Sequence, residues 1–358
     1  MMSLRRKSRA IAILLLLALS VVSGCARDNR DSSKGEAAHQ GFTDAAGRNL
    51  TIPKDIKKVY CTSPIGTIFI YTLAPDRLAG WNYELAPEEK EYILPEYRGL
   101  PVLGGWFGKS NTGNIEEILK VRPDIILSMG TVGKSSISSA DEIQKKLGIP
   151  VLVVDGSLTS LSKTYETMGR LLGTEKKAKE LGSYCSEALS WVTKAVASIP
   201  EKERPRVYYA EGPKGLLTDP KGSPHVEALD VCGGINVAEC PLKEGYGRTE
   251  VSIEQIMSWD PDIIIAGESD FFAKVFDDPR WKGLKAVKER RVYLIPRYPF
   301  NWFDRPPSVN RVVGLWWVSD FLHKDRLKIE VGRKAKEFYS KFYHMDLTED
   351  RLNKMLNP

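Results

Sequence analysis

The sequence has no apolar run long enough to cross a bilayer as a helix, which takes about 20 residues; its N-terminal apolar run extends only from Ile11 to Val22. It also lacks the H-E-x-x-H and G-x-S-x-G patterns of metalloproteases and α/β hydrolases. Its 358 residues include only four histidines, and its five cysteines show no C-x-x-C spacing. We therefore expect no enzyme activity, no cofactor and no site for a bare metal ion.

The N-terminal segment has the features of a signal peptide, because four basic residues precede the apolar run. The sequence Val22-Ser23-Gly24-Cys25 resembles the bacterial lipobox, which implies cleavage after residue 24 and a lipid on Cys25. An uncleaved anchor and secretion without a lipid are the alternatives. Residues 25–42 are expected to form a flexible tether, because residues 26–41 include no apolar residue larger than alanine.

Loss of residues 1–24 removes four positive charges and no negative ones, so the formal net charge falls from +6 to +2. This small charge gives little support to nucleic acid binding. The remaining chain is longer than one core usually organises, which favours two domains. Export permits disulfides, and Cys232 and Cys240 are the only close pair; a bond between them and buried thiols are both compatible with the sequence.

An internal repeat is the most informative feature of the sequence. Residues 115–127 recur as residues 253–265, with seven of thirteen positions identical at an offset of 138. Asn114 and Ser252 precede Glu117 and Gln255 by three residues, which is the capping-box pattern at the start of a helix. Each copy is therefore expected to begin a short helix.

The apolar spacing predicts which side of each helix packs inward. The residues expected to face the core are Ile115, Ile118 and Leu119 in the first copy and Ile253, Ile256 and Met257 in the second. A Pro-Asp pair then ends each helix, and the apolar run that follows is typical of a strand buried on both faces of a parallel sheet. A helix and strand used twice in this way predict two α/β lobes.

Further strands are expected at 58–62, 78–81, 151–154, 206–210 and 292–295. Between the lobes, residues 175–199 keep a helical apolar period without proline, which predicts a helix of about 35 Å that joins them. The predicted organisation is therefore an N-terminal lobe at 43–174, a bridging helix at 175–199, and a C-terminal lobe with terminal helices at 200–358. The lobes are expected to be Rossmann-like, with mainly parallel sheets.

At this level the chain resembles the substrate-binding proteins of ABC importers for iron-siderophores, haem and vitamin B12. The segments that carry the resemblance are 114–116, 229–237, 251–254, 281–288 and 291–293, together with the Pro-Asp turns. The resemblance implies a ligand held between two lobes, a rigid bridging helix, and an ABC permease and its ATPase as partners. Separately, we expect a monomer that the lipid on Cys25 holds on the outer face of the cytoplasmic membrane, at the cell surface or in the periplasm.

The resemblance further implies that one glutamate per lobe docks on the permease, and these are Glu116 and Glu254. The residues agree, because capping occupies their neighbours and leaves both carboxylates pointing outward. An alternative is that each carboxylate only favours the positive end of a helix dipole.

Ligand contacts are expected in loops that follow strands, as in other open α/β sheets. The candidates combine aromatic rings, which cover a flat ligand, with arginines, which hold oxyanions or carboxylates. They are Trp81, Tyr83, Trp106, Phe107, Tyr209, Tyr246, Arg248, Arg297, Tyr298, Trp302 and Arg305. Core packing is the alternative for Trp106, and a structural ion pair, such as Asp304 with Arg305, is the alternative for each arginine.

These residues suggest an anionic, partly aromatic metal complex that brings its own chelator. An iron(III)-siderophore is the first choice, followed by an oxyanion such as molybdate or tungstate, and then cobalamin or haem. His225 is the only histidine expected near the cleft. A sensory lipoprotein of the same fold and an exported enzyme are lower alternatives.

Overall fold

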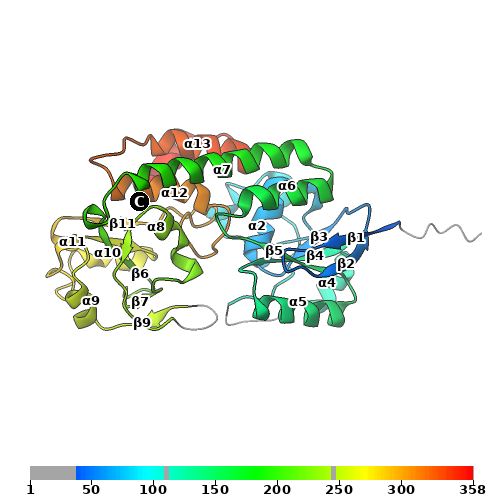
Figure 1. Ribbon diagram of the computed structural model, residues 1–358, viewed down its shortest axis with the longest axis horizontal. Helices are drawn as coiled ribbons and strands as arrows, with labels where there is room; N and C mark the ends of the chain where they lie inside the picture. Colours follow the sequence, from blue (N-terminus) through cyan, green and yellow to red (C-terminus); the bar gives the residue numbers. More distant parts are fainter. Residues whose placement is uncertain (1–37, 109–112, 243–246, 358) are drawn as a thin grey trace, which may run out of the picture. The chain divides into compact units, whose positions relative to one another are not determined.

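The computed structural model describes residues 38–108, 113–242 and 247–357, and its contacts group the chain from His39 onward into one compact unit. This unit contains two α/β lobes, each built on a parallel sheet (Figure 1). No helix in the described ranges is both long and apolar enough to cross a membrane. The signal peptide and Cys25 lie outside the described residues.

The N-terminal lobe contains a parallel sheet in the order β3-β4-β5 and an antiparallel hairpin, β1-β2. Its strands are β1 (His39–Thr43), β2 (Asn49–Pro53), β3 (Val59–Cys61), β4 (Ile125–Gly130) and β5 (Val151–Asp155). Its helices are α2 (Pro64–Leu73), α3 (Pro87–Lys90), α4 (Ile115–Val121), α5 (Lys134–Leu147) and α6 (Leu161–Leu172). The predicted strand at 78–81 forms only isolated bridges, Val59 to Leu78 and Trp81 to Val102.

The C-terminal lobe contains a four-stranded parallel sheet in the order β11-β10-β6-β8 and a short antiparallel pair, β7-β9. Its strands are β6 (Arg206–Ala210), β7 (Leu217–Thr218), β8 (Ile235–Asn236), β9 (Thr249–Glu250), β10 (Ile263–Ala266) and β11 (Val292–Leu294). Its helices are α8 (Glu227–Val231), α9 (Ile253–Trp259), α10 (Ser269–Val275) and α11 (Lys285–Lys288).

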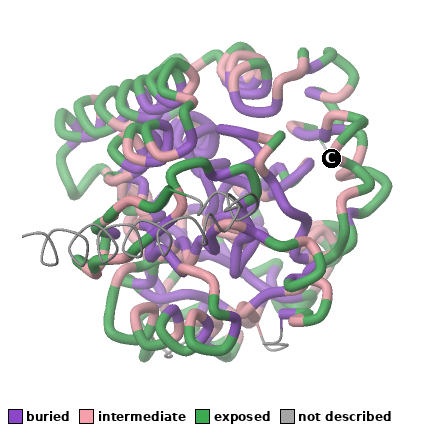
Figure 2. Tube along the Cα trace, turned by 90° about the vertical axis from the view of Figure 1, so that its right-hand side faces the viewer, coloured by how far each residue is buried: buried purple, intermediate pink, exposed green. Residues whose placement is uncertain are grey.

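Helix α7 (Glu175–Ala197) runs from one lobe to the other (Figure 1), two residues shorter than the sequence predicts. Against it pack α12 (Arg311–Leu322) and α13 (Val331–Phe342), and α14 (Glu349–Leu356) follows. Helix α13 also contacts α2, so the C-terminal helices return to the N-terminal lobe. One apolar core therefore extends through α7 into both lobes, and it appears as the buried interior of Figure 2.

The repeat forms the same helix-turn-strand unit in both lobes. Asp124 and Asp262 each follow the proline after the helix, and each carboxylate accepts a backbone hydrogen bond from the start of a neighbouring strand segment. The donors to Asp124 are the amides of Lys57 and Lys58, at 2.7 and 2.8 Å, and the donor to Asp262 is the amide of Arg206, at 3.0 Å. The repeat thus fixes how each helix joins its sheet.

Two details of the repeat differ from the sequence prediction. Leu119 and Met257 do not face the core: 45% and 49% of their surface is exposed, because Ile118 and Ile256 fill the inward positions. The capping box is complete only in α9, where Ser252 and Gln255 bond reciprocally. In α4 the side chain of Asn114 caps the helix, but Glu117 pairs with Lys120 instead of returning to the cap.

Candidate functional site

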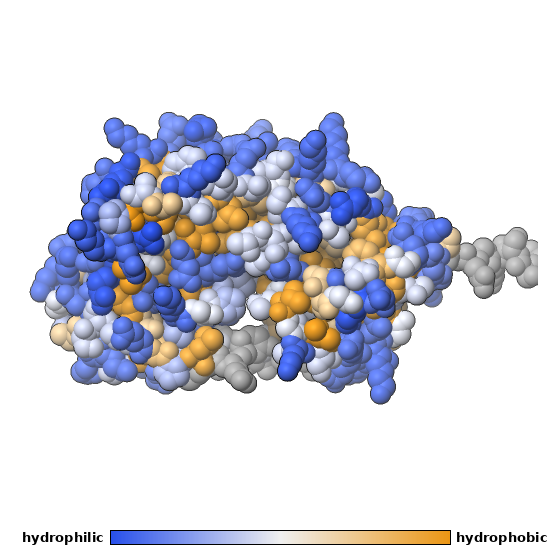
Figure 3. Space-filling model, in the orientation of Figure 1, coloured by the Kyte–Doolittle hydropathy of each residue, from blue (hydrophilic) through white to orange (hydrophobic). Residues whose placement is uncertain are grey.

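Two adjoining hollows lie between residues of the two lobes. We call them the large hollow, with a volume of about 960 Å³, and the small hollow, with a volume of about 270 Å³. Tyr83, Arg305 and Pro306 line both, so the hollows form one continuous cleft. Figure 3 shows apolar surface beside the hollow between the lobes.

The large hollow lies at the carboxyl ends of the strands in the N-terminal lobe. Ser63 follows β3 closely, Gly130 ends β4 and Asp155 ends β5, and all three line it. This is where the edges of open α/β sheets usually bind ligands. Tyr83 and Phe107 add aromatic surface on the same side. The C-terminal lobe supplies the opposite wall through residues 222–225 and the segment around Arg305.

The small hollow lies at the carboxyl ends of the strands in the C-terminal lobe. Glu211 follows β6, Gly267 follows β10, and Arg297 comes shortly after β11. Its charged lining consists of Arg248, Arg297, Arg305, Glu88, Glu89, Glu211 and Glu268. In the described part of this lining, four carboxylates therefore face three guanidinium groups.

A buried network of charges holds Arg305 in place. Its Nη2 donates to Asp219 at 2.6 Å, its Nε lies 3.4 Å from Asp304, and it also pairs with Glu211. Arg248 bonds the same Glu211 at 3.0 Å. Both arginines are thus paired within the protein, which is the alternative that the sequence left open.

Burial and pairing shift the acidity of this network in different directions. Desolvation raises the pKa of Glu211 to about 7, although the hydrogen bond and charge of Arg305 oppose this shift. Desolvation also acts on Asp219, but its hydrogen bonds and the charges of His225 and Arg305 outweigh it and lower the pKa of that carboxyl. The two carboxyl groups that pair with Arg305 therefore differ: the pKa of Glu211 is raised and that of Asp219 is lowered.

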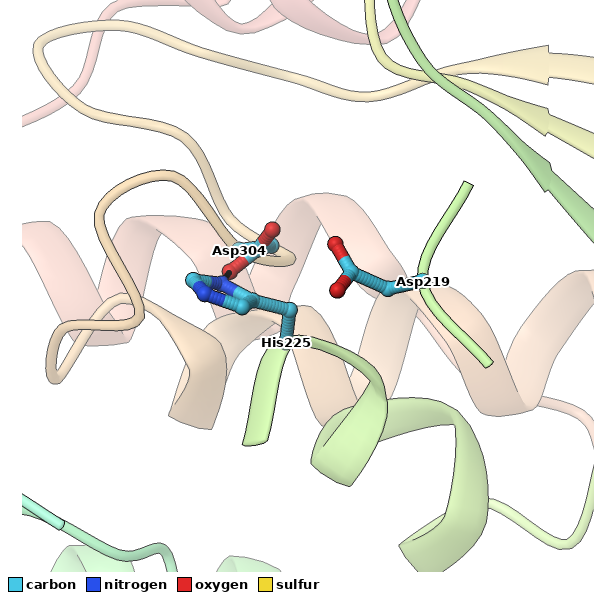
Figure 4. A group of neighbouring side chains, drawn as sticks. All are labelled: Asp219, His225 and Asp304. Atoms are coloured by element: carbon cyan, nitrogen blue, oxygen red, sulfur yellow. Dashed lines mark hydrogen bonds and ion pairs between the residues drawn. The ribbon is translucent and has the colours of Figure 1, made fainter. Parts of the chain in front are cut away.

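His225 is held by the same network. It lines the large hollow, and its Nδ1 lies 2.5 Å from Oδ1 of the fully buried Asp304. In Figure 4, His225 and Asp304 lie together and Asp219 lies across from them. Among the described residues, Asp219, His225 and Asp304 form a group whose ligand atoms lie within 4.8 Å of one another.

This group is not arranged as a site for a bare ion, because Arg305 already contacts both aspartates. A divalent cation would have to displace the guanidinium. The carboxylate of Asp304 instead orients the imidazole, and no partner within the described chain bonds its Nε2.

An ion pair between the buried Arg311 and the partly exposed Glu227 links the two lobes beside the large hollow. Arg311, at the start of α12, donates to the carbonyl of Gly156 at 2.6 Å and pairs with Glu227. Glu227 accepts the amide of Leu158 at 2.9 Å. One ion pair from the C-terminal lobe thus binds the backbone of the N-terminal lobe directly after β5.

The family model described as "Periplasmic binding protein" matches residues 103–299, more than half of the chain. The chain belongs to this family. It is a substrate-binding protein of an ABC transporter, not an enzyme, and it works with a permease and an ATPase.

Three relatives illustrate the likeness. A solved ABC transporter solute binding protein from Sulfurospirillum deleyianum is 33% identical, with a TM-score of 0.83, over 89% of this chain and 99% of that one. The molybdate-binding protein MolA of Haemophilus influenzae is 22% identical over 86% of this chain and 92% of its own length. The uncharacterized substrate-binding lipoprotein YvrC of Bacillus subtilis is 27% identical over 80% and 90%.

The binding protein brings most of the candidate ligand residues to the cleft. Those that line it are Tyr83, Phe107, Tyr209, Arg248, Arg297, Tyr298 and Arg305. Tyr246 lies outside the described residues. Trp106 lines neither hollow and packs edge-on to Tyr60, with 6.3 Å between ring centroids.

Trp81 and Trp302 lie in the core instead of on the cleft wall. Trp302 is fully buried and donates to the hydroxyl of Tyr339 at 3.0 Å, while Trp81 donates to the carbonyl of Tyr97 at 2.8 Å. Gly314 on α12 lets the backbone at Trp302 approach closely, since a Cβ there would lie 1.9 Å from the carbonyl oxygen of Trp302. Trp302 therefore anchors the segment that carries Asp304 and Arg305.

The sequence reasoning missed several cleft residues. Ser63, Gly130 and Asp155 follow strands that were predicted, so the rule for strand ends could have selected them. Asp219 lines neither hollow but holds Arg305, and it had no such signal because the two residues are 86 positions apart.

Proposed function

We propose that this protein is an exported lipoprotein that captures a metal chelate of low or positive charge in the cleft and delivers it to its permease. The observation that carries this proposal is His225 on the wall of the large hollow, oriented by Asp304 and with Nε2 unpaired within the described chain. An imidazole in this setting supplies one ligand to a metal whose chelator leaves a coordination position open. An iron(III)-siderophore is the cargo that we favour.

The size of the cleft supports a chelate over a small ion. A hollow of about 960 Å³ lies near the upper end of the range of roughly 300–1,000 Å³ for sites that enclose drug-sized ligands. Tyr83 and Phe107 offer flat apolar area to such a ligand.

The charges of the large hollow argue against a strongly anionic cargo. Among the described residues that line it, Asp155, Glu227 and Asp230 face Arg305 and Arg311, so carboxylates outnumber guanidinium groups. Both arginines are also paired with carboxylates. The sequence suggested an anionic complex because it showed the arginines without their partners.

The test is to titrate the purified protein with a ferric complex of a tetradentate hydroxamate chelator and follow its charge-transfer absorbance. We expect H225A to weaken binding at least tenfold and to abolish the change in absorbance that accompanies coordination. The matched control is H39A, because His39 is exposed in β1 and lines neither hollow. Equal binding and equal spectra for H225A and the native protein would refute ligation by His225.

An oxyanion in the small hollow is the second candidate. Arg297 favours it, because this arginine lines the small hollow and forms no ion pair in the described part of the chain; its guanidinium lies 5.8 Å from the ring centroid of Tyr298. The relative MolA is a molybdate-binding protein. Tight molybdate binding that R297M abolishes and H225A leaves unchanged would select this candidate over a chelate.

The proposal includes a lipid on Cys25 and docking through Glu116 and Glu254. The relative YvrC is a lipoprotein, and both glutamates are exposed on equivalent helices. The C25S variant should leave the membrane fraction. Reversal of Glu116 or Glu254 to arginine should abolish uptake while ligand affinity in solution stays unchanged.

A further inference from the structure

Large apolar side chains are seldom exposed in the described residues, and those that are exposed gather near the repeated helices. They are Val102, Leu119, Trp191, Leu242 and Met257. Leu119 and Met257 occupy the same position of the repeat, 138 residues apart, and about half of each is exposed.

Val102 and Leu242 lie close to the same helices. Val102 precedes Leu103, whose carbonyl accepts the amide of Asn114, the cap of α4, at 2.9 Å. Leu242 follows Pro241, whose carbonyl accepts the hydroxyl of Thr249 at 2.8 Å, just before α9. Only Trp191 lies elsewhere, on α7 against Trp316.

Leu119 and Met257 each lie beside one of the two glutamates proposed to dock. Glu116 and Leu119 are three residues apart on α4, and Glu254 and Met257 are three apart on α9, so each pair shares a helix face. Within the described chain neither glutamate forms an ion pair, whereas the neighbouring Glu117 pairs with Lys120.

The inward positions of the two helices belong to Ile118 and Ile256, so Leu119 and Met257 keep about half of their surface exposed. Exposed apolar surface favours a partner that covers it. Both lobes carry a glutamate followed three residues later by an exposed apolar side chain. This repetition fits a partner made of two identical subunits related by a two-fold axis, because such a partner offers the same surface to each lobe.

We propose that each lobe docks through a carboxylate and an apolar side chain together, Glu116 with Leu119 and Glu254 with Met257. The partner is a two-fold symmetric permease, and each of its subunits offers a cationic side chain beside an apolar recess. This inference rests on the docking role proposed for the two glutamates. An exposed ion pair contributes little to affinity, so the apolar contacts hold the complex together while the carboxylates speed its association.

The experiment measures binding of the ligand-free protein to its permease–ATPase complex in nanodiscs, by surface plasmon resonance at two salt concentrations. We expect L119S and M257S each to weaken binding about tenfold, mainly through faster dissociation and with unchanged salt dependence. E116R and E254R should instead slow association and reduce its salt dependence. The matched control is W191Q, which alters a similarly exposed apolar residue on α7 and should bind as the native protein does.

Thermal unfolding of each variant establishes that it is folded. Native binding by L119S and M257S, with binding lost in E116R and E254R, would overturn this inference and leave the docking glutamates in place. Native binding by all four variants would overturn both. A loss confined to one lobe would refute the two-fold arrangement.

Discussion

The two lobes are alike on their repeated helices and unlike on their cleft walls. Helices α4 and α9 carry an exposed glutamate and an exposed apolar residue at matching positions. The walls of the large hollow differ: among the described residues, Asp155 is the only charged one from the N-terminal lobe, whereas the C-terminal lobe brings Glu227, Asp230, Arg305 and Arg311 together with His225.

This difference follows from what each surface is proposed to meet. A two-fold permease would contact both lobes in the same way, so both helices present the same groups. A single asymmetric ligand contacts each wall differently. One lobe can therefore offer backbone and aromatic surface, while the other concentrates charge and the imidazole.

The largest expected effect is a loss of stability when a buried arginine is replaced, and it should be larger in the C-terminal lobe than in the N-terminal lobe. R305M leaves Glu211, Asp219 and Asp304 without their shared cation, and we expect it to lower the free energy of unfolding by about 3–5 kcal/mol. R48M in the N-terminal lobe should cost only about 1–2 kcal/mol. The reason is that the buried Asp44, the partner of Arg48, also accepts three backbone amides at 3.0 Å each.

Urea unfolding of the two variants measures both free energies. Equal losses of unfolding free energy in the two variants would contradict this prediction. They would show that the carboxylates around Arg305 depend on their arginine no more than Asp44 depends on Arg48.

A smaller effect concerns pH. The folded pKa of Glu211, about 7, lies above its ordinary value of 4.5, so its contribution favours the folded state at low pH and is lost as pH rises between these values. Its size is at most about 3 kcal/mol, and E211Q should remove it. Asp155 has the opposite sign, because hydrogen bonds from Ser160 and Ser157 outweigh desolvation and lower its pKa. Its contribution is present above its ordinary value of 3.8 and is lost as pH falls below it.

The measurement is the melting temperature of the native protein, E211Q and D155N from pH 3 to pH 8. E211Q should differ from the native protein in its slope between pH 5 and pH 8, and D155N only in acid. If the melting temperature of E211Q changed with pH between pH 5 and pH 8 as that of the native protein does, the raised pKa of Glu211 would be contradicted.

The smallest effect compares the two helix caps. S252A removes half of a reciprocal capping box and should cost about 1 kcal/mol, whereas N114A removes a single hydrogen bond of 3.3 Å and should cost about half as much. Denaturant midpoints of the two variants give the order. A larger loss for N114A would reverse this part of the comparison.

Local sequence signals predicted much of the fold. Strand β6 has the predicted bounds, and α7 begins at the predicted residue, because both depend on apolar patterns within their own segments. Leu119 and Met257 were assigned wrongly because helical spacing permits an apolar face wider than the one that packs.

The site was less accessible from sequence. Strand ends and aromatic loops indicated Tyr83 and Phe107, but Trp81 and Trp302 carry the same composition and are buried. The partners of Arg305 come from segments up to 94 residues away, so only the folded chain shows that its charge is balanced.

The charge of the cargo is the part of the proposed function that an experiment can test most directly. Equilibrium dialysis of the purified protein should compare a cationic ferric complex of a tetradentate dihydroxamate, which leaves coordination positions on the iron open, an anionic ferric tricatecholate and molybdate under the same conditions. We predict at least tenfold tighter binding of the cationic chelate than of either anion. Tighter binding of the tricatecholate or of molybdate would contradict a large hollow whose arginines, Arg305 and Arg311, are already paired with carboxylates.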